Sequence, residues 1–141
     1  MLKQLSVFVE NRPGALSSIC GVLKENGIDM RALSLADTQQ FGILRMLVPD
    51  PVFAKSVLEK AGFTVKTTDV LVLSVPDRTG GLAEVMQIID RHGLSVEYMY
   101  AFPSFGDGKA MIVFRFSDPE NARKELAGEN LQISDSGAAA E

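Results

Sequence analysis

The sequence lacks several features on which common protein functions depend. It contains no cluster of lysine and arginine, and it is acidic, with a formal net charge of -4 and a pI near 5.0. Binding to a nucleic-acid backbone needs such a cluster to displace counterions, so we expect no nucleic-acid partner. It also lacks a run of about 18 apolar residues, which predicts no membrane span and no membrane partner.

Residues that carry redox, metal and nucleophilic chemistry are scarce, with one cysteine and one histidine in the chain. A single cysteine cannot form an internal disulfide, and residues 1–4 do not open an apolar segment like that of a signal peptide, so we expect a cytoplasmic protein. Cys20 is expected to be a buried filler on a helix, and His92, beside Gly93 at a helix end, to be structural. No cluster of His, Cys and carboxylates is present, which predicts no metal, no cofactor and no enzyme activity.

A duplicated turn is the strongest feature that is present. Residues Asn11–Leu16 return 66 positions later as Asp77–Leu82. Each copy follows an alternating apolar strand and opens a helix with apolar residues at i, i+3, i+4 and i+7. These apolar helix positions are Leu16, Ile19, Cys20 and Leu23 in the first copy and Leu82, Val85, Met86 and Ile89 in the second. The repeat predicts two units of roughly 65 residues, a size at which burial is marginal.

The remaining elements follow the same order in both copies. A hairpin follows each first helix, a second helix begins after Asp50 or Asp118, and a last strand closes the unit. The hairpins are expected over residues 30–48 and 96–116, and the closing strands over 64–68 and 131–134. The pattern predicts an α+β fold of two tandem ferredoxin-like βαββαβ units, with antiparallel sheets side by side and helices on one face.

We expect the units to span residues 1–69 and 70–134 with no flexible linker, and residues 135–141 to form a frayed tail. The run Ala110–Phe114 is apolar throughout, and a strand of this kind is usually covered on both faces. Since the helices cover only one face, the open face is expected to pack against another sheet, most simply that of a second copy in a homodimer. This face is expected to include Phe8, Val70 and Val72.

The unit resembles the ACT domain. The resemblance rests on a first turn of the form Asn/Asp-x-x-Gly-x-Leu and on a first helix that ends in Gly-Ile or Gly-Leu, and two tandem copies cover residues 1 to about 134. It implies regulation by a small molecule, most often a free amino acid. It also implies that two units pair through their first helices and second strands, with the ligand at the seam. Residues 109–116 are also faintly similar to the stacking strand of an RNA-recognition motif, but lack its glycine and first aromatic residue.

On the ACT resemblance, the ligand-binding residues are the two turns and the starts of the second strands that would face them. They are Asn11, Arg12, Pro13, Gly14, Ala15, Leu16, Met30, Arg31 and Ala32, and in the second copy Asp77, Arg78, Thr79, Gly80, Gly81, Leu82, Val96, Glu97 and Tyr98. The backbone N–H groups of residues 14–15 or 80–81 suit a carboxylate, and the side-chain oxygen of Asn11 or Asp77 suits an ammonium group. The alternative is that Asn11, Asp77 and Thr79 only cap a helix.

The two copies differ along one face of the second strand. The small residues there are Ala32, Ser34 and Ala36 in the first copy, and the aromatic ones are Tyr98, Tyr100 and Phe102 in the second. This difference predicts two seam pockets of different shape, unless the aromatic residues simply pack in a core or a dimer face.

Together these features predict a non-catalytic sensor that binds a free amino acid and regulates a partner protein or pathway. The alternative is a protein-interaction subunit of a metabolic enzyme with no ligand of its own. Neither the amino acid nor the partner can be named from the residues.

Overall fold

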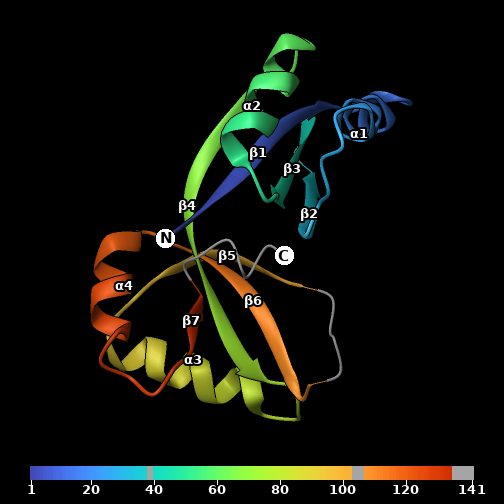
Figure 1. Ribbon diagram of the computed structural model, residues 1–141. Helices are drawn as coiled ribbons and strands as arrows, with labels where there is room; N and C mark the ends of the chain where they lie inside the picture. Colours follow the sequence, from blue (N-terminus) through green and yellow to red (C-terminus); the bar gives the residue numbers. More distant parts are fainter. Residues whose placement is uncertain (38–39, 103–106, 135–141) are drawn as a thin grey trace. The chain divides into compact units, whose positions relative to one another are not determined.

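The structure is a computed structural model that describes residues 1–37, 40–102 and 107–134 (Figure 1). The chain divides into two compact units. We call residues 3–68 the N-terminal unit, and residues 69–134 together with Met1 and Leu2 the C-terminal unit. The expected tail at 135–141 and parts of both hairpin loops, at 38–39 and 103–106, lie outside the described residues.

The N-terminal unit has the element order expected from the sequence. Its elements are β1 (Leu2–Glu10), α1 (Ala15–Glu25), β2 (Ala32–Asp37), β3 (Phe41–Leu47), α2 (Pro51–Lys60) and the first part of β4 (Val65–Pro76). The strand order is β2-β3-β1-β4, and α1 and α2 contact each other. This is the ferredoxin-like order, in which each helix connects two strands that are separated by a third.

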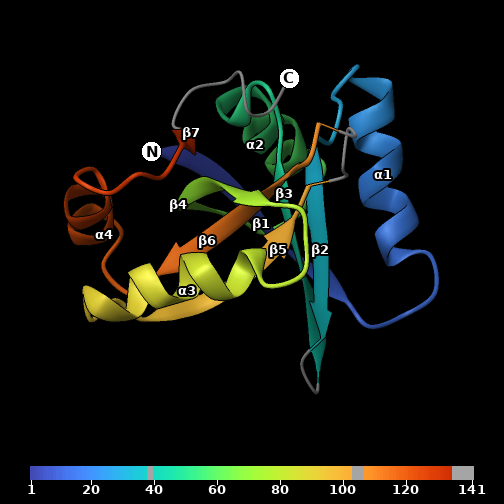
Figure 2. The same ribbon diagram turned by 90° about the horizontal axis from the view of Figure 1, so that it is seen from below.

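The C-terminal unit repeats this arrangement. Its elements are the second part of β4, α3 (Gly81–Arg91), β5 (Val96–Ala101), β6 (Lys109–Phe116), α4 (Pro119–Leu126) and β7 (Ile133–Ser134). The strand order is β5-β6-β4-β7, with α3 and α4 as the yellow and red helices of Figure 2. The α+β class and the two ferredoxin-like units are therefore confirmed, whereas the side-by-side placement of the sheets stays a prediction.

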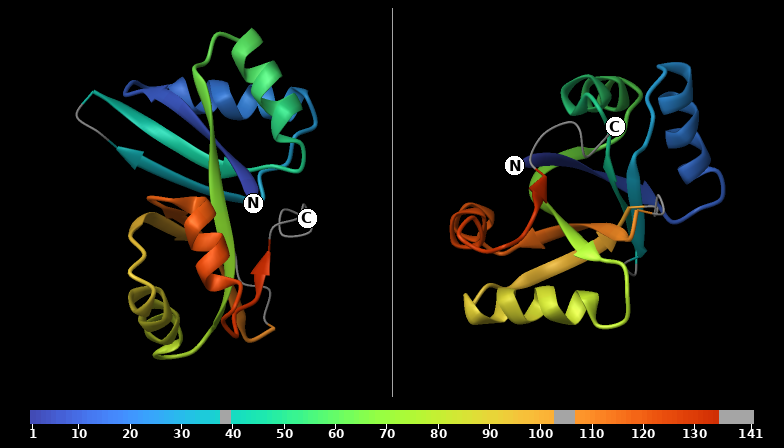
Figure 3. Two further views of the ribbon diagram at one scale, coloured as in Figure 1. Left: turned by 90° about the vertical axis from the view of Figure 1, so that its left-hand side faces the viewer. Right: turned by 60° about the horizontal axis from the view of Figure 1, so that its bottom comes forward.

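Strand β4 joins the two units without a linker. It is one continuous strand of 12 residues, drawn in light green in Figure 3. Its first part pairs with β1, and its second part pairs with β6 and β7. Among the described residues, no helix is long and apolar enough to cross a membrane.

Each unit has its own hydrophobic core between its helices and one face of its sheet. The N-terminal core includes Leu5, Ile19, Leu44, Met46 and Leu58, and the C-terminal core includes Leu71, Leu73, Ile89, Phe114 and Phe116. Asp50 and Asp118 begin α2 and α4 as expected, because their carboxylates accept hydrogen bonds from the N–H groups of Phe53 and Asn121 at 3.0 and 3.1 Å.

The buried face of α1 differs from the sequence expectation. The structure buries Ala15, Ile19 and Leu23, whereas Leu16 is 37% exposed and Cys20 is also exposed. Successive residues of a helix are rotated by about 100°. When Ile19 is at the centre of the buried face, Leu16 and Cys20 therefore lie at the side of the helix and not against the core. The prediction that Cys20 is a buried filler is wrong.

Residues expected on the open sheet face differ in their exposure. Val70, Val72 and Val113 have no exposed surface, whereas Phe8 is 37% exposed and packs edge to face on Phe41. The homodimer stays a prediction.

Candidate functional site

The two predicted ligand turns have the same backbone geometry. In each unit the residue before the first helix is a glycine in the left-handed region, Gly14 with φ +86° and Gly80 with φ +85°. No side chain accepts a hydrogen bond from the start of α1 or α3. The alternative that Asn11, Asp77 and Thr79 serve as helix caps is therefore wrong, because glycine occupies the cap position in both units.

Two of the four backbone N–H groups expected to bind a carboxylate take part in the turns themselves. Ala15 N–H donates to the Arg12 carbonyl at 3.3 Å, and Gly81 N–H donates to the Arg78 carbonyl at 2.9 Å. These turn bonds do not use the N–H groups of Gly14 and Gly80. Both turns are exposed to solvent over residues 11–14 and 77–80. The glycine N–H groups are thus the better-placed donors for a ligand carboxylate.

Each turn carries an arginine that pairs with a glutamate of its own unit. The Arg12 Nε lies 2.6 Å from a Glu10 carboxylate oxygen, whereas an Arg78 Nη lies 2.8 Å from both oxygens of Glu84. All four side chains are more than half exposed, so each pair contributes only about 0–1 kcal/mol. A ligand carboxylate could recruit either arginine at small cost.

The starts of the second strands lie far from the turn of the same unit. Because β1 and β2 both run antiparallel to β3, they run parallel to each other, and the turn after β1 lies near the end of β2. Ala32, at the start of β2, pairs with Leu47 at the other end of the sheet. The start of β2, Met30–Ala32, can therefore face a ligand turn only if that turn belongs to a second module. The same holds for Val96–Tyr98 at the start of β5.

A small hollow of about 160 Å³ lies beside the first turn. It is lined by Val9, Glu10, Asn11, Arg12, Leu16, Leu35, Asp37 and Gly42. Sequence reasoning identified three of these residues, Asn11, Arg12 and Leu16. It missed those contributed by the end of β2 and the start of β3, although the parallel course of β1 and β2 in this fold was a signal that could have found them.

The aromatic residues of β5 lie on the face of the sheet opposite α3. Met99 pairs with the core residue Phe114, so the alternation along a strand places Tyr98 and Tyr100 on the other face. Tyr100 pairs there with the buried Val113. The prediction of two differently shaped seam pockets and its alternative, a packing role for the aromatic residues, both stay predictions.

Two larger hollows occupy equivalent places in the two units, and we call them the N-terminal and C-terminal notches. The N-terminal notch, of about 600 Å³, is lined by Phe8, Val9, Glu10, Arg12, Ala15, Ser18, Val22, Phe41, Ala61, Gly62, Phe63 and Thr64. The C-terminal notch, of about 520 Å³, is lined by Ser74, Pro76, Glu84, Val85, Ile88, Gly108, Lys109, Asn130, Leu131 and Gln132. Sequence reasoning predicted neither notch.

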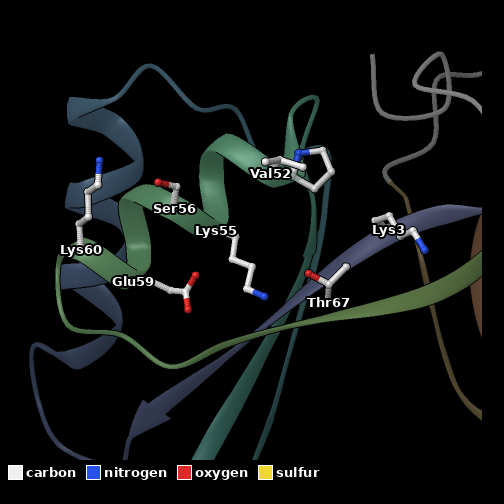
Figure 4. A pocket seen from close by; sticks show the side chains of 8 residues that line it. Lys3, Val52, Lys55, Ser56, Glu59, Lys60 and Thr67 are labelled. Carbon is white, nitrogen blue, oxygen red and sulfur yellow. The ribbon is translucent and has the colours of Figure 1, made fainter.

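A further hollow of about 820 Å³ lies beside α2 in the N-terminal unit (Figure 4). It is lined by Lys3, Pro51, Val52, Lys55, Ser56, Glu59, Lys60 and Thr67. In Figure 4, Lys55 and Glu59 extend from α2 towards β1 and β4. None of the predicted ligand residues lines this hollow.

His92 joins the ends of two helices. Its Nδ1 lies 3.1 Å from a Glu125 oxygen and its Nε2 lies 2.7 Å from a Glu129 oxygen. The hydrogen bond to Glu129, followed by that to Glu125, raises the pKa of His92 above 6.5. In the described ranges, no group of three or more His, Cys, Asp or Glu residues is placed to hold a metal ion. These contacts agree with a structural role for His92.

Comparison with known proteins identifies the family. A family model described as an ACT domain pair matches residues 1–139. The solved structure of protein BT0572 from Bacteroides thetaiotaomicron is similar at 34% identity and a TM-score of 0.92, covering 99% of this chain and 96% of that one. No curated protein matches the sequence.

Two further solved structures share the fold at lower identity. The regulatory subunit of aspartate kinase from Thermus thermophilus has 16% identity and a TM-score of 0.65, covering 89% of this chain and 87% of that one. The corresponding subunit from Thermus flavus has 15% identity and a TM-score of 0.60, covering 89% and 90%. Because this family model matches nearly the whole length of the chain, the chain belongs to the ACT domain pair family.

Proposed function

We propose that this chain is a non-catalytic sensor that binds a free amino acid and regulates a partner protein or pathway in the cytoplasm. The ligand would bind where the turn before α1 or α3 meets the second strand of another ACT module. The duplicated uncapped turn is the main support, because Gly14 and Gly80 open their helices without a side-chain cap. Such a helix start offers N–H groups and a favourable dipole to a carboxylate.

The flank formed by α1 and β2 supports the pairing of modules. Leu33 and Leu35 share the helix-covered face with the core residues Met46 and Leu44, yet they are 53% and 52% exposed. β2 is an end strand in the order of its unit, and in the C-terminal unit Met99 of β5 is 43% exposed. Exposed apolar side chains on an edge strand suit contact with another module.

The same flank supports the second candidate function, a protein-interaction subunit without a ligand. Regulatory subunits of aspartate kinase are built on this fold, so a metabolic enzyme is a reasonable partner for this chain too. An amino acid that binds one arrangement of the modules better than another would increase the population of the arrangement it prefers. The affinity of the chain for its partner would change as a result. The two functions are therefore compatible, and ligand binding distinguishes them.

Calorimetric titration of turn variants tests the proposal. Asn11→Ala and Asp77→Ala remove exposed side chains that cap no helix, so both variants should fold normally. We expect the affinity for the amino acid that binds the wild type to fall about tenfold or more in at least one variant, as the loss of a charge-assisted hydrogen bond would cause. Unchanged affinity in both variants and in the double variant would place the ligand elsewhere.

A further inference from the structure

The two notches form for the same structural reason. In the N-terminal unit, Phe8 N–H donates to the Thr64 carbonyl at 3.0 Å, and in the C-terminal unit Ser74 N–H donates to the Gln132 carbonyl at 3.0 Å. These bonds lie at equivalent positions of the repeat. Beyond them, the first strand of each unit extends past the point where its last strand begins, so the two strands are no longer paired. The first helix and the turn before the last strand border the resulting gap.

The two notches differ in chemistry at several equivalent positions of the repeat. In particular, the aromatic residues Phe8 and Phe41 in the first notch are matched by the polar residues Ser74 and Lys109 in the second, and Thr64 is matched by the longer Gln132. In the C-terminal notch the Lys109 Nζ donates a hydrogen bond of 3.3 Å to the Gln132 Oε1, so the two longer side chains join across it.

The N-terminal notch has an aromatic wall. The rings of Phe8 and Phe41 meet edge to face with centroids 5.3 Å apart, and each residue remains 37% exposed. Phe63 and Val22 also line the notch, and both pack on the core of the unit. An aromatic ring in the notch would meet apolar surface on several sides, including further ring faces or edges. The notch volume also lies within the range of small-molecule sites, about 300–1,000 Å³.

Complementary charges stand beside this wall. Glu10 and Arg12 both line the notch, and their ion pair uses the Arg12 Nε and one carboxylate oxygen of Glu10. The terminal nitrogens of Arg12 are suited to a ligand carboxylate, and the second oxygen of Glu10 to a ligand ammonium group. An α-amino acid carries both groups on one carbon, next to its side chain.

We propose that the N-terminal notch is a ligand site within a single ACT module and that it binds an aromatic α-amino acid. The inference rests on the proposed function for the class of ligand, an amino acid, but it adds a second location and names the side chain. The notch and the hollow beside the first turn share Val9, Glu10 and Arg12. Gly62 and Thr64 line only the notch, whereas Leu35 and Gly42 line only the hollow, so backbone amides can report which place is occupied.

The experiment is a nuclear magnetic resonance titration of the full, ¹⁵N-labelled chain with L-phenylalanine, and with L-alanine as the probe that lacks the ring. The test variant, Phe8→Ser with Phe41→Lys, installs the residues that the C-terminal unit carries at the same positions, so the fold should accept them. Phe53→Ser removes a phenylalanine of similar exposure that does not line the notch, and serves as the matched control.

We expect L-phenylalanine to shift the amides of Gly62 and Thr64, and L-alanine to bind at least about tenfold more weakly. The double variant should lose affinity for L-phenylalanine by about tenfold or more, and Phe53→Ser should retain it. Shifts confined to Leu35, Gly42 and the turn residues, unchanged in the double variant, would overturn the notch site and leave the proposed function standing. If none of the twenty amino acids binds the wild type, both proposals fail.

Discussion

At the scale of single residues, Gly81 has no room for a side chain. A Cβ atom at Gly81 would collide with the carbonyl oxygen of Pro76, whereas the equivalent residue of the first unit is the buried Ala15. We expect Gly81→Ala to lower the free energy of unfolding by about 1–3 kcal/mol in urea denaturation, because a backbone oxygen cannot move aside easily. Gly21→Ala is the control, since a Cβ there meets no atom within 4 Å and the residue lies inside α1. It should raise stability by about 0.5–1 kcal/mol. Equal effects of the two substitutions would contradict this account.

His92 supplies a residue-scale prediction about pH. Its pKa is raised by the hydrogen bonds to Glu129 and Glu125, so the folded C-terminal unit favours the protonated ring. The contribution to stability is therefore full below pH 6.5 and is lost as the pH rises through the raised pKa. Urea midpoints of the wild type, measured between about pH 6 and pH 8, should decrease more than those of His92→Gln. Parallel pH profiles would show that the ring does not titrate in this way.

The residue scale also shows where sequence reasoning stops. The pattern located both turns, but it could not decide whether Asn11 or a glycine caps the helix, since both residue types are common caps. The pattern also assigned Leu16 and Cys20 to the buried face of α1. Ala15 is apolar too, so the helical spacing of the apolar residues does not fix which side of the helix faces the core. The N-terminal notch was missed because Phe8, Phe41 and Phe63 come from three separate segments that only the folded chain brings together.

At the scale of elements, α4 is the shortest of the described helices. It has 8 residues and buries Ala122 and Leu126, and in its first turn the Asp118 carboxylate accepts a hydrogen bond from the Asn121 N–H group. We expect Asp118→Ala to cost about 1 kcal/mol and to speed hydrogen exchange in α4 more than in β6. Asp50→Ala in α2 is the matched control, which should leave α4 protection unchanged. Uniform loss of protection across the C-terminal unit would show that α4 does not open separately.

Element order was predictable because each element has a local signal. Alternation marked the strands, Asp50 and Asp118 marked the second helices, and Gly27 and Gly93 ended the first ones with φ of +65° and +66°. The continuity of β4 also followed, since the closing strand of one copy leads directly into the opening strand of the next. No local sequence signal shows which module pairs with the edge strand of a unit. The predicted seam between two modules therefore still rests on the family resemblance.

At the scale of the whole molecule, we propose that an ACT domain pair with two uncapped turns senses a free amino acid. Thermal unfolding of the purified protein with each of the twenty amino acids in turn tests it most directly, because a ligand at one hundred times its dissociation constant adds about 2.7 kcal/mol to stability. We expect a rise in Tm with one amino acid or a few chemically related ones, and a smaller rise in Gly14→Val or Gly80→Val variants that still fold. A Tm that no amino acid changes at millimolar concentration would contradict it and favour the interaction subunit without a ligand.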